Sequence, residues 1–305
     1  MASPAVSSPL TSTWSRYKAW AQTARGLKAS LDRWRLWTLI LAIAGAILVT
    51  MGQQLGSLTA ATAPWVALAG KIIGLGGAGA IALSTYFARE ALSNESVQRW
   101  TRCRSAAESL KACTYLYRAG VPPFDGADRD QKLLERRTAI ENAMEGVEET
   151  VTQVQDASFD PSPLSSDDYC VKRVDDQVRF YESRAADYQK KTRAFRAAVL
   201  WLGAIAVILG VAAALKLPVA GWTAVIATVT AAITSHVQSQ RYQSLIATYQ
   251  ATTRHLGTLK DKWMAGDKTD TSRNTFIQSC EDTMALENSA WITQWSQQKP
   301  PGQRS

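Results

Sequence analysis

The chain contains one apolar pattern twice, at residues 45–52 and 203–210, and this repetition constrains its fold more than any other feature. The stretches Gly-Ala-Ile-Leu-Val-Thr-Met-Gly and Gly-Ala-Ile-Ala-Val-Ile-Leu-Gly share five of eight residues. Each is followed by a short turn, a tryptophan (Trp65 or Trp222) and a second apolar run. Self-similarity of this kind indicates duplication of one structural unit. We therefore predict two copies of a helical hairpin.

Four apolar runs are long enough to cross a membrane: residues 36–55, 65–87, 197–215 and 218–237. A transmembrane helix needs about 20 apolar residues to cross a hydrocarbon layer of roughly 30 Å. The alternative, buried core helices of a soluble protein, fits less well because the runs carry few charges and occur in pairs. No convincing strand-like alternation is longer than four residues. We predict an all-α integral membrane protein with two repeated transmembrane hairpins extended by long cytosolic helices.

Lysine and arginine residues flank the apolar runs asymmetrically. They are frequent before the first run, after the second and before the third, whereas the turn at 56–64 has no charge and the other turn has only Lys216. Flanks rich in lysine and arginine stay in the cytoplasm. We therefore predict that both termini and the middle segment are cytoplasmic.

The four cysteines (Cys103, Cys113, Cys170 and Cys280) lie in the polar segments without a metal-binding spacing. They fall on the predicted cytosolic side, where thiols stay reduced. Because the chain has only two histidines, we expect no zinc site. The first apolar run follows 35 mostly polar residues, so we expect a membrane span there and no cleavable leader.

Helical periodicity and turn residues divide the chain into two similar parts. We predict, in order, a disordered N-terminus at 1–13, a first repeat at 14–158, a linker at 159–169, a second repeat at 170–298 and a tail at 299–305. Within the repeats, the pattern predicts polar helices at 89–119, 129–155, 241–265 and 272–297. The first of these ends before Gly120, a typical helix stop.

Glycines recur inside the apolar runs. Residues 74–79 match the dinucleotide fingerprint G-x-G-x-x-G, but that motif binds a pyrophosphate only between a strand and a helix. Close helix packing explains them better, because Gly70 and Gly74 form G-x-x-x-G and Gly77 continues that face. We also expect matching packing grooves at the glycines of the first and third runs: Gly45, Gly52, Gly203 and Gly210.

Three threonines, Thr223, Thr230 and Thr234, share one face of the fourth run. Their hydroxyl groups could line a water-filled path and so make this run part of a pore. Threonine hydroxyls also donate to carbonyls of the preceding helical turn. The sequence leaves both interpretations open.

Basic and aromatic residues are interleaved in the polar helix that follows each hairpin. Cations beside stacking rings are typical of sites for single-stranded nucleic acid or nucleotides. Two alternatives remain open, since aromatic residues at helical spacing also form helix cores and cations near a membrane also serve topology and anionic lipid. The candidate ligand-binding residues are Arg99, Arg102, Arg104, Lys111, Arg118, Arg241, Arg254 and Lys260.

No pattern supports catalysis. The chain has no nucleophile elbow, no H-E-x-x-H motif and no phosphate loop, and neither His236 nor His255 has a recognisable catalytic partner. We expect a protein that is not an enzyme and has no resident cofactor, with a nucleotide or oligonucleotide as its ligand.

The order of these elements resembles the SLATT family of two-span membrane effectors associated with bacterial nucleotide signalling. The shared features are a basic amphipathic helix, a hairpin with a tight loop, a long returning helix and the terminal residues Glu281, Glu287, Asn288 and Trp291. The resemblance covers residues 14–298 as a tandem arrangement. The first repeat departs from it, because the acidic segment 141–149 stands where the terminal tryptophan would be.

The resemblance implies an anti-phage effector of the bacterial inner membrane that oligomerises into a pore or channel, depolarises the membrane and arrests the infected cell. It also implies regulation by a nucleotide or oligonucleotide from a partner nucleotidyltransferase, as in Hailong-type systems. Four spans offer few pore-lining faces, so we expect a homo-oligomer, with a tetramer as our hypothesis. The alternative is a non-conducting membrane scaffold that recruits cytosolic partners through its helical stalk.

Overall fold

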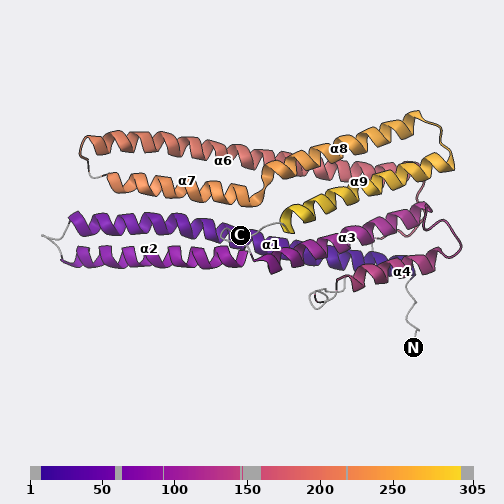
Figure 1. The fold of residues 1–305 in the computed structure, drawn as a ribbon, viewed down its shortest axis with the longest axis horizontal. Coiled ribbons are helices and arrows are strands. Elements are labelled where there is room, and N and C mark those ends of the chain that lie inside the picture. Colours follow the sequence, from indigo (N-terminus) through magenta and orange to yellow (C-terminus); the bar gives the residue numbers. More distant parts are fainter. Residues whose placement is uncertain are drawn as a thin grey trace, which may run out of the picture. The chain divides into compact units, whose positions relative to one another are not determined.

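The computed structural model describes residues 8–58, 64–91, 93–144, 146, 159–217 and 219–296. These residues form helices and connecting loops without a strand (Figure 1). The predicted all-α class is therefore confirmed.

The first helix, α1 (Pro9–Leu58), contains the first apolar run. Its start corrects our prediction for residues 1–13, because residues 9–13 are helical and residues 1–7 lie outside the described part. The Ser8 hydroxyl accepts a hydrogen bond from the Thr11 N–H at 3.3 Å, and Pro9 occupies the first turn, where a helix needs no N–H donor. Leu10 and Thr13 are buried, so packing also stabilises this turn.

The helices of the first repeat continue with α2 (Pro64–Ala91), α3 (Asn94–Ala119) and α4 (Arg129–Asn142). The predicted continuous helix at 89–119 is wrong, because the chain leaves the helix between Ala91 and Asn94. Serine and asparagine, which occupy positions 93 and 94, favour helix starts over helix interiors.

Helix α3 ends where we predicted, at Gly120. This glycine has a φ of 62° and closes a Schellman motif, in which the Val121 N–H donates to the Leu116 carbonyl at 3.3 Å. The helix predicted at 129–155 is described as far as Asn142. Most of its acidic second half, including Glu145, Glu148 and Glu149, lies outside the described residues.

The second repeat has a similar order of helices. Its elements are α5 (Ser166–Tyr169), the π-helical turn η2 (Cys170–Asp175), α6 (Asp176–Ala214), α7 (Ala220–Gln240), α8 (Tyr242–Ala265) and α9 (Asp270–Ser296). Arg241 has a φ of 50° and separates α7 from α8. Each repeat therefore interrupts the helix after its second apolar run.

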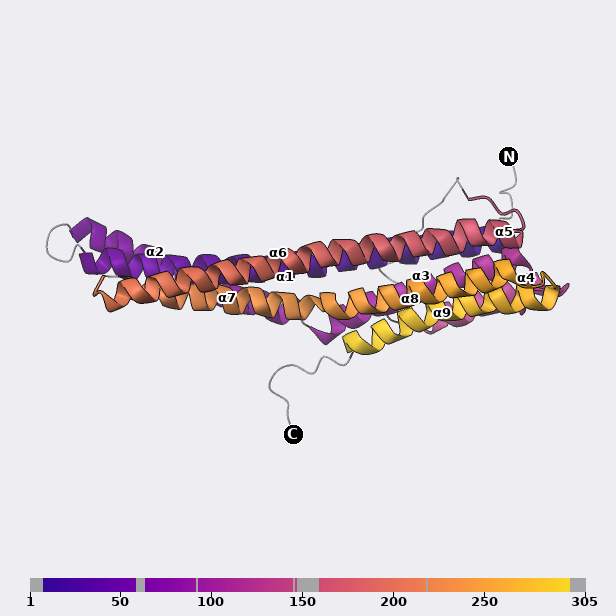
Figure 2. The same ribbon diagram turned by 90° about the horizontal axis from the view of Figure 1, so that it is seen from above.

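The chain folds into two compact units, and each takes segments from both repeats. The stalk unit consists of Met1–Ala29, Asn94–Ala185 and Ile246–Ser305, and the span unit consists of Ser30–Ser93 and Ala186–Leu245. Helices α1 and α6 each contribute residues to both units (Figure 2).

Within the described residues, four helical stretches are long and apolar enough to cross a membrane: Pro9–Gly56, Pro64–Arg89, Ser166–Ala214 and Ala220–Ala265. They contain the first two predicted apolar runs in full and most of the third and fourth. Large apolar side chains on them remain exposed, with Leu75 and Leu200 each 75% exposed. Contiguous exposed apolar surface of this kind is typical of contact with lipid. The chain is a multi-pass membrane protein.

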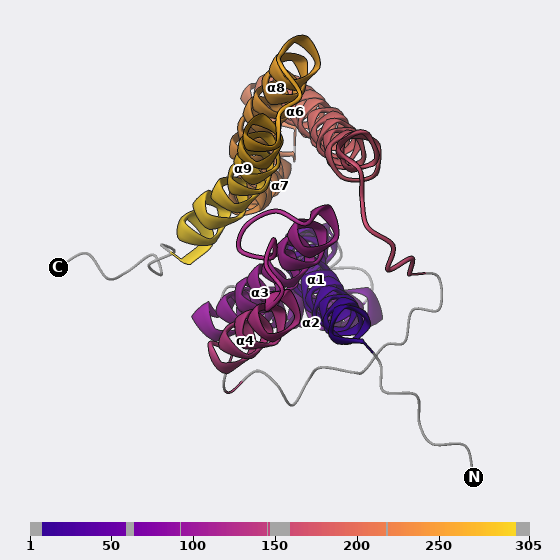
Figure 3. The same cartoon turned by 90° about the vertical axis from the view of Figure 1, so that its right-hand side faces the viewer.

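The stalk unit has a compact core. Leu10, Cys113, Tyr117, Phe124 and Leu133 form a buried cluster that joins α1, α3 and α4. Helix α3 packs against α9 and also against α4, which lies beside it in Figure 3. Because α3 belongs to the first repeat and α9 to the second, both repeats build this unit.

Candidate functional site

A buried ion pair joins the start of the second repeat to its last helix. Arg173 on η2 donates to both carboxylate oxygens of Glu281 on α9, at 2.8 and 2.7 Å. The Tyr169 hydroxyl donates to the same carboxylate at 2.9 Å, and the Tyr115 ring centre lies 4.8 Å from the guanidinium carbon. Arg173 is 2% exposed and Glu281 is 5% exposed. Since removal of one partner would leave a buried uncompensated charge, this pair fixes α9 in place.

The π-helical turn η2 positions Arg173. A π-turn has more residues than an α-helical turn, and it frequently marks functional sites. In η2, Arg173 and Val174 are both buried, while Asp175 is half-buried and accepts a hydrogen bond from Lys260 at 2.5 Å. Upstream, Ser165 caps α5 by accepting from the Asp168 N–H at 3.1 Å.

Glu287, the second buried carboxylate of α9, contacts both repeats. The Tyr181 hydroxyl donates to one oxygen at 3.3 Å, and Nη2 of Arg104 lies 3.5 Å from the other. Burial raises the pKa of Glu287 above its usual range, and the positive charge of Arg104 opposes this shift. Arg104 belongs to the first repeat, so the contact couples the two repeats within the stalk unit.

Among the residues that the structure describes, at least three of the eight predicted ligand-binding cations are paired with carboxylates. Arg104 contacts Glu287, and Lys260 contacts Asp175. Arg118 donates to the Ser162 carbonyl at 2.9 Å and lies 3.5 Å from Asp160. These pairs hold the segments of the stalk unit together, which is a structural role.

The other five candidates have different environments. Lys111 is half-buried, and burial, followed by the charge of Arg173, lowers the pKa of its ammonium group. Arg102 is exposed and donates to the Ala143 carbonyl beyond the end of α4 at 2.9 Å. The remaining three are the half-exposed Arg99 on α3, the exposed Arg254 on α8, and Arg241, which lies in the span unit.

All four cysteines are buried, and none forms a disulfide with another. Burial raises the pKa of Cys103 and of Cys113 to about 11, so both thiols are protonated at neutral pH and are weak nucleophiles. In the part of the chain that the structure describes, no group of three His, Cys, Asp or Glu side chains could hold a metal ion.

The glycines of the first hairpin bring α1 and α2 into close contact. A Cβ atom on Gly52 would lie 2.5 Å from the Gly70 carbonyl oxygen and 2.6 Å from the Gly74 nitrogen. A Cβ atom on Gly45 would lie 2.9 Å from the Gly77 carbonyl oxygen. A side chain at either position would collide with backbone, so glycine is required for this approach.

The glycines of the second hairpin differ. A Cβ atom on Gly203 or Gly210 would meet no heavy atom within 4 Å, so no helix of the chain fills the groove predicted there. Helix α7 packs instead against α1. A Cβ atom on Gly221 would lie 3.2 Å from Thr50, and the Trp222 indole N–H donates to Gln54 at 3.0 Å.

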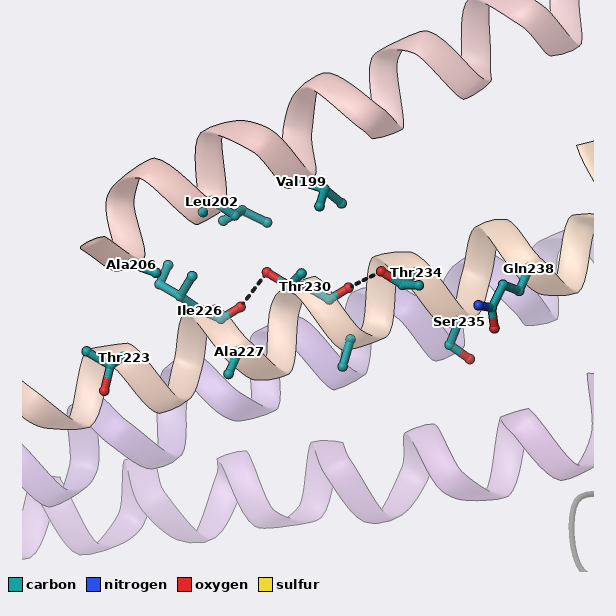
Figure 4. Close-up of a pocket in the computed structure, with 12 residues that line it drawn as sticks. Val199, Leu202, Ala206, Thr223, Ile226, Ala227, Thr230, Thr234, Ser235 and Gln238 are labelled. Atoms are coloured by element: carbon teal, nitrogen blue, oxygen red, sulfur yellow. Dashed lines mark hydrogen bonds between the residues drawn. The ribbon is translucent and has the colours of Figure 1, made fainter. Parts of the chain in front are cut away.

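A groove with a volume of about 710 Å³ lies between α6 and α7 (Figure 4). The predicted threonine stripe forms part of its lining. Thr223 donates to the Ala220 carbonyl at 2.6 Å, Thr230 to the Ile226 carbonyl at 2.8 Å and Thr234 to the Thr230 carbonyl at 2.8 Å. The hydroxyl protons are therefore used within α7, as the structural interpretation of these residues predicts.

Comparison with known families gives a match to each half of the chain. Residues 169–291 match the SMODS and SLOG-associating 2TM effector domain 1, abbreviated SLATT. The second repeat therefore resembles a SLATT domain over nearly its whole length. Residues 18–132 match a protein family of unknown function, DUF4231, and the two matches together are consistent with a tandem SLATT-type protein. No curated protein and no solved structure matches the chain.

The SLATT match is to an effector domain with two transmembrane segments. The match begins at Tyr169 and includes Arg173, Glu281 and Glu287. Both buried carboxylates that we singled out by resemblance thus anchor the last helix of the SLATT domain. Sequence reasoning missed Tyr169, Arg173 and Tyr181, because residues so far from α9 in the chain give no periodic signal.

Proposed function

We propose that the protein is a membrane effector, regulated by a nucleotide or oligonucleotide, that oligomerises into a pore and depolarises the bacterial inner membrane in anti-phage defence. The SLATT match supports the effector role. The observation that carries the pore is the pair of apolar hairpins, whose large side chains remain exposed along four membrane-length helices. The proposal assigns the chain no catalytic step.

A pore requires several copies of the chain. Four spans in one chain provide few faces that could surround water, and closed rings are the usual symmetry of homo-oligomers. Helix α6 supports assembly, because Gly210 leaves its surface open to an approaching helix. We propose a tetramer with both termini in the cytoplasm, since the segments rich in lysine and arginine remain on that side.

Regulation requires that the ligand bind the open and closed states with different affinities. Because Arg104, Arg118 and Lys260 form ion pairs, the ligand proposal rests first on the exposed Arg254 and the half-exposed Arg99 of the stalk unit. An oligonucleotide from a partner nucleotidyltransferase, as in Hailong-type systems, suits such basic side chains.

The central test is expression in bacteria with and without the partner enzyme, with membrane potential followed by a voltage-sensitive dye. We expect depolarisation and growth arrest in one of the two conditions. Normal polarisation in both would contradict the proposal. Planar-bilayer recordings of the purified protein test the non-conducting scaffold, which predicts silence where the pore predicts ligand-dependent conductance steps.

A separate test addresses the ligand. A quadruple variant in which glutamine replaces four arginines should lose nucleotide control and remain assembled in the membrane. The four are Arg99, Arg102, Arg241 and Arg254. Affinity for the oligonucleotide should fall steeply with salt in the wild type, because each phosphate contact releases counterions. The matched control neutralises four other exposed cations: Arg25, Arg179, Arg184 and Lys262. Equal loss of binding in both variants would exclude the four arginines as a specific sensor.

A further inference from the structure

The groove between α6 and α7 has an apolar lining. Helix α6 contributes Val199, Leu202, Gly203 and Ala206, and α7 contributes Ile226, Ala227 and Ala231 beside its threonines. Because Thr223, Thr230 and Thr234 donate their hydroxyl protons to α7 carbonyls, they offer no further donors to a guest. Ser235 and Gln238 are the other polar residues of the lining, and both lie near the end of α7. Ordered water needs two to four polar partners, so the part of the groove away from these two side chains favours hydrocarbon over water.

The neighbouring surface is also suited to lipid. Val207 on α6 is 68% exposed and lies four residues after Gly203, on nearly the same side of the helix, so the surface beside the groove faces the bilayer. Small residues, above all Gly203, Ala206 and Ala227, make the depression between the two helices. A depression at such a surface fits one flexible acyl chain.

Cations stand at one end of this groove. Val199 and Gln238 line its end nearest the polar part of α6, where Lys190, Lys191, Arg193 and Arg196 are all exposed. At 3.6 residues per turn, Arg196 lies on nearly the same side of α6 as Val199, three residues before it. Lys191 lies three turns before Leu202 on the same side, whereas Lys190 and Arg193 lie on other sides.

From this arrangement we propose that the groove binds one anionic phospholipid of the cytoplasmic leaflet. One acyl chain lies along Gly203, Ala206 and Ala227, and Lys191 and Arg196 bind the phosphate. The two cations complement the negative headgroup, and the groove complements the chain. This lipid site is a binding function beyond the proposed pore, and its test needs no conductance.

The first test uses native mass spectrometry of the full-length protein, with phosphatidylglycerol and phosphatidylcholine that have identical acyl chains. The wild type should retain phosphatidylglycerol preferentially. The double variant Lys191→Gln, Arg196→Gln should bind it about 30-fold more weakly, since each basic side chain near a membrane surface changes affinity about fivefold.

The matched control is Lys190→Gln, Arg193→Gln, which removes the same charge from other sides of the same helix turns. It should keep the wild-type preference. Equal loss in both double variants would show that diffuse surface charge attracts the lipid. Equal retention of the two lipids by the wild type would show no selectivity for the anionic headgroup. Either result would overturn the proposal.

The second test fills the groove. Ala206→Phe should reduce retained phosphatidylglycerol with both cations intact, and Ala227→Leu provides an independent, smaller change if the first variant unfolds. Undiminished lipid binding by the folded filled variant would overturn the acyl-chain part of the proposal. Disulfide-linked dimers formed by an Ala206→Cys variant would show that a second copy of the chain occupies the groove, which would also overturn it.

Discussion

Glu281 loses its hydration inside the stalk unit and receives three hydrogen bonds in return, two from Arg173 and one from Tyr169. Glu287 is less completely satisfied, because its contacts with Tyr181 and Arg104 are longer, at 3.3 and 3.5 Å. Two carboxylates on one helix therefore have different strengths of attachment, and each gives a separate prediction.

Glu281→Gln should destabilise the stalk unit by about 3–5 kcal/mol, because the Arg173 guanidinium would remain buried without a counter-charge. Urea unfolding of the detergent-solubilised protein, followed by tryptophan fluorescence, measures the change. The neighbouring variant Asp282→Asn is the control, since Asp282 is exposed. Similar midpoints for the two variants would contradict the structural role of the pair.

Glu287 should give a pH-dependent contribution to stability. Burial raises its pKa above the ordinary glutamate value of 4.5. At a pH just above 4.5, the carboxyl group is therefore protonated in a larger fraction of folded molecules than of unfolded molecules. The free energy of unfolding of the wild type, relative to Glu287→Gln, should therefore rise as pH falls from neutral towards 4.5. Urea unfolding of both proteins across this range measures it. A constant difference would show that the carboxyl has the same proton affinity in both states.

Individual site residues were only partly predictable. The basic composition of the polar helices identified Arg104, Arg118 and Lys260, but not the carboxylates that bind them. Those partners lie on other segments of the stalk unit, and only the folded chain brings them together. The position of Arg173 depends on a π-turn, which has no reliable sequence signal.

At the scale of helices and hairpins, apolar run length predicted the four spans, because a membrane sets the length that a helix needs. The joints between helices were harder to predict. Gly120 could be identified as a stop, since glycine readily adopts the left-handed conformation. Arg241 adopts the same conformation without a glycine. The change from apolar to polar sequence predicted a new helix from 241, but residue type did not predict the left-handed joint.

The first hairpin allows a direct test of glycine packing. Gly52→Ala should destabilise it by about 1–3 kcal/mol or more, because the new Cβ would meet backbone atoms of α2 at 2.5 and 2.6 Å. The control is Gly76→Ala on α2, where a Cβ atom meets nothing within 4 Å. Thermal unfolding in detergent, read by circular dichroism, compares them. A melting temperature of Gly52→Ala equal to that of the control would contradict the close approach of α1 and α2.

At the scale of the whole molecule, the duplication and the likeness of the second repeat to a SLATT domain could be predicted, because repeated sequence implies repeated structure. The two compact units could not. They combine parts of both repeats, since the long helices α1 and α6 contribute to each unit and α3 packs on α9. The repeated apolar pattern also packs differently in the two hairpins. Its glycines contact the backbone of α2 in the first hairpin, whereas a Cβ atom on those of the second would meet no heavy atom within 4 Å.

This asymmetry predicts which hairpin carries assembly. Gly210 has no heavy atom of the chain within 4 Å of an added Cβ and is not part of the groove lining, so Gly210→Leu should leave the fold of one chain unchanged. A leucine would block close approach of a helix from another copy, and we expect native mass spectrometry in detergent to show fewer oligomers. Gly76→Leu, at another open position on α2, is the matched control and should assemble normally. Unchanged oligomers in Gly210→Leu would show that copies meet through a different face, because a glycine required for contact cannot accept so large a side chain.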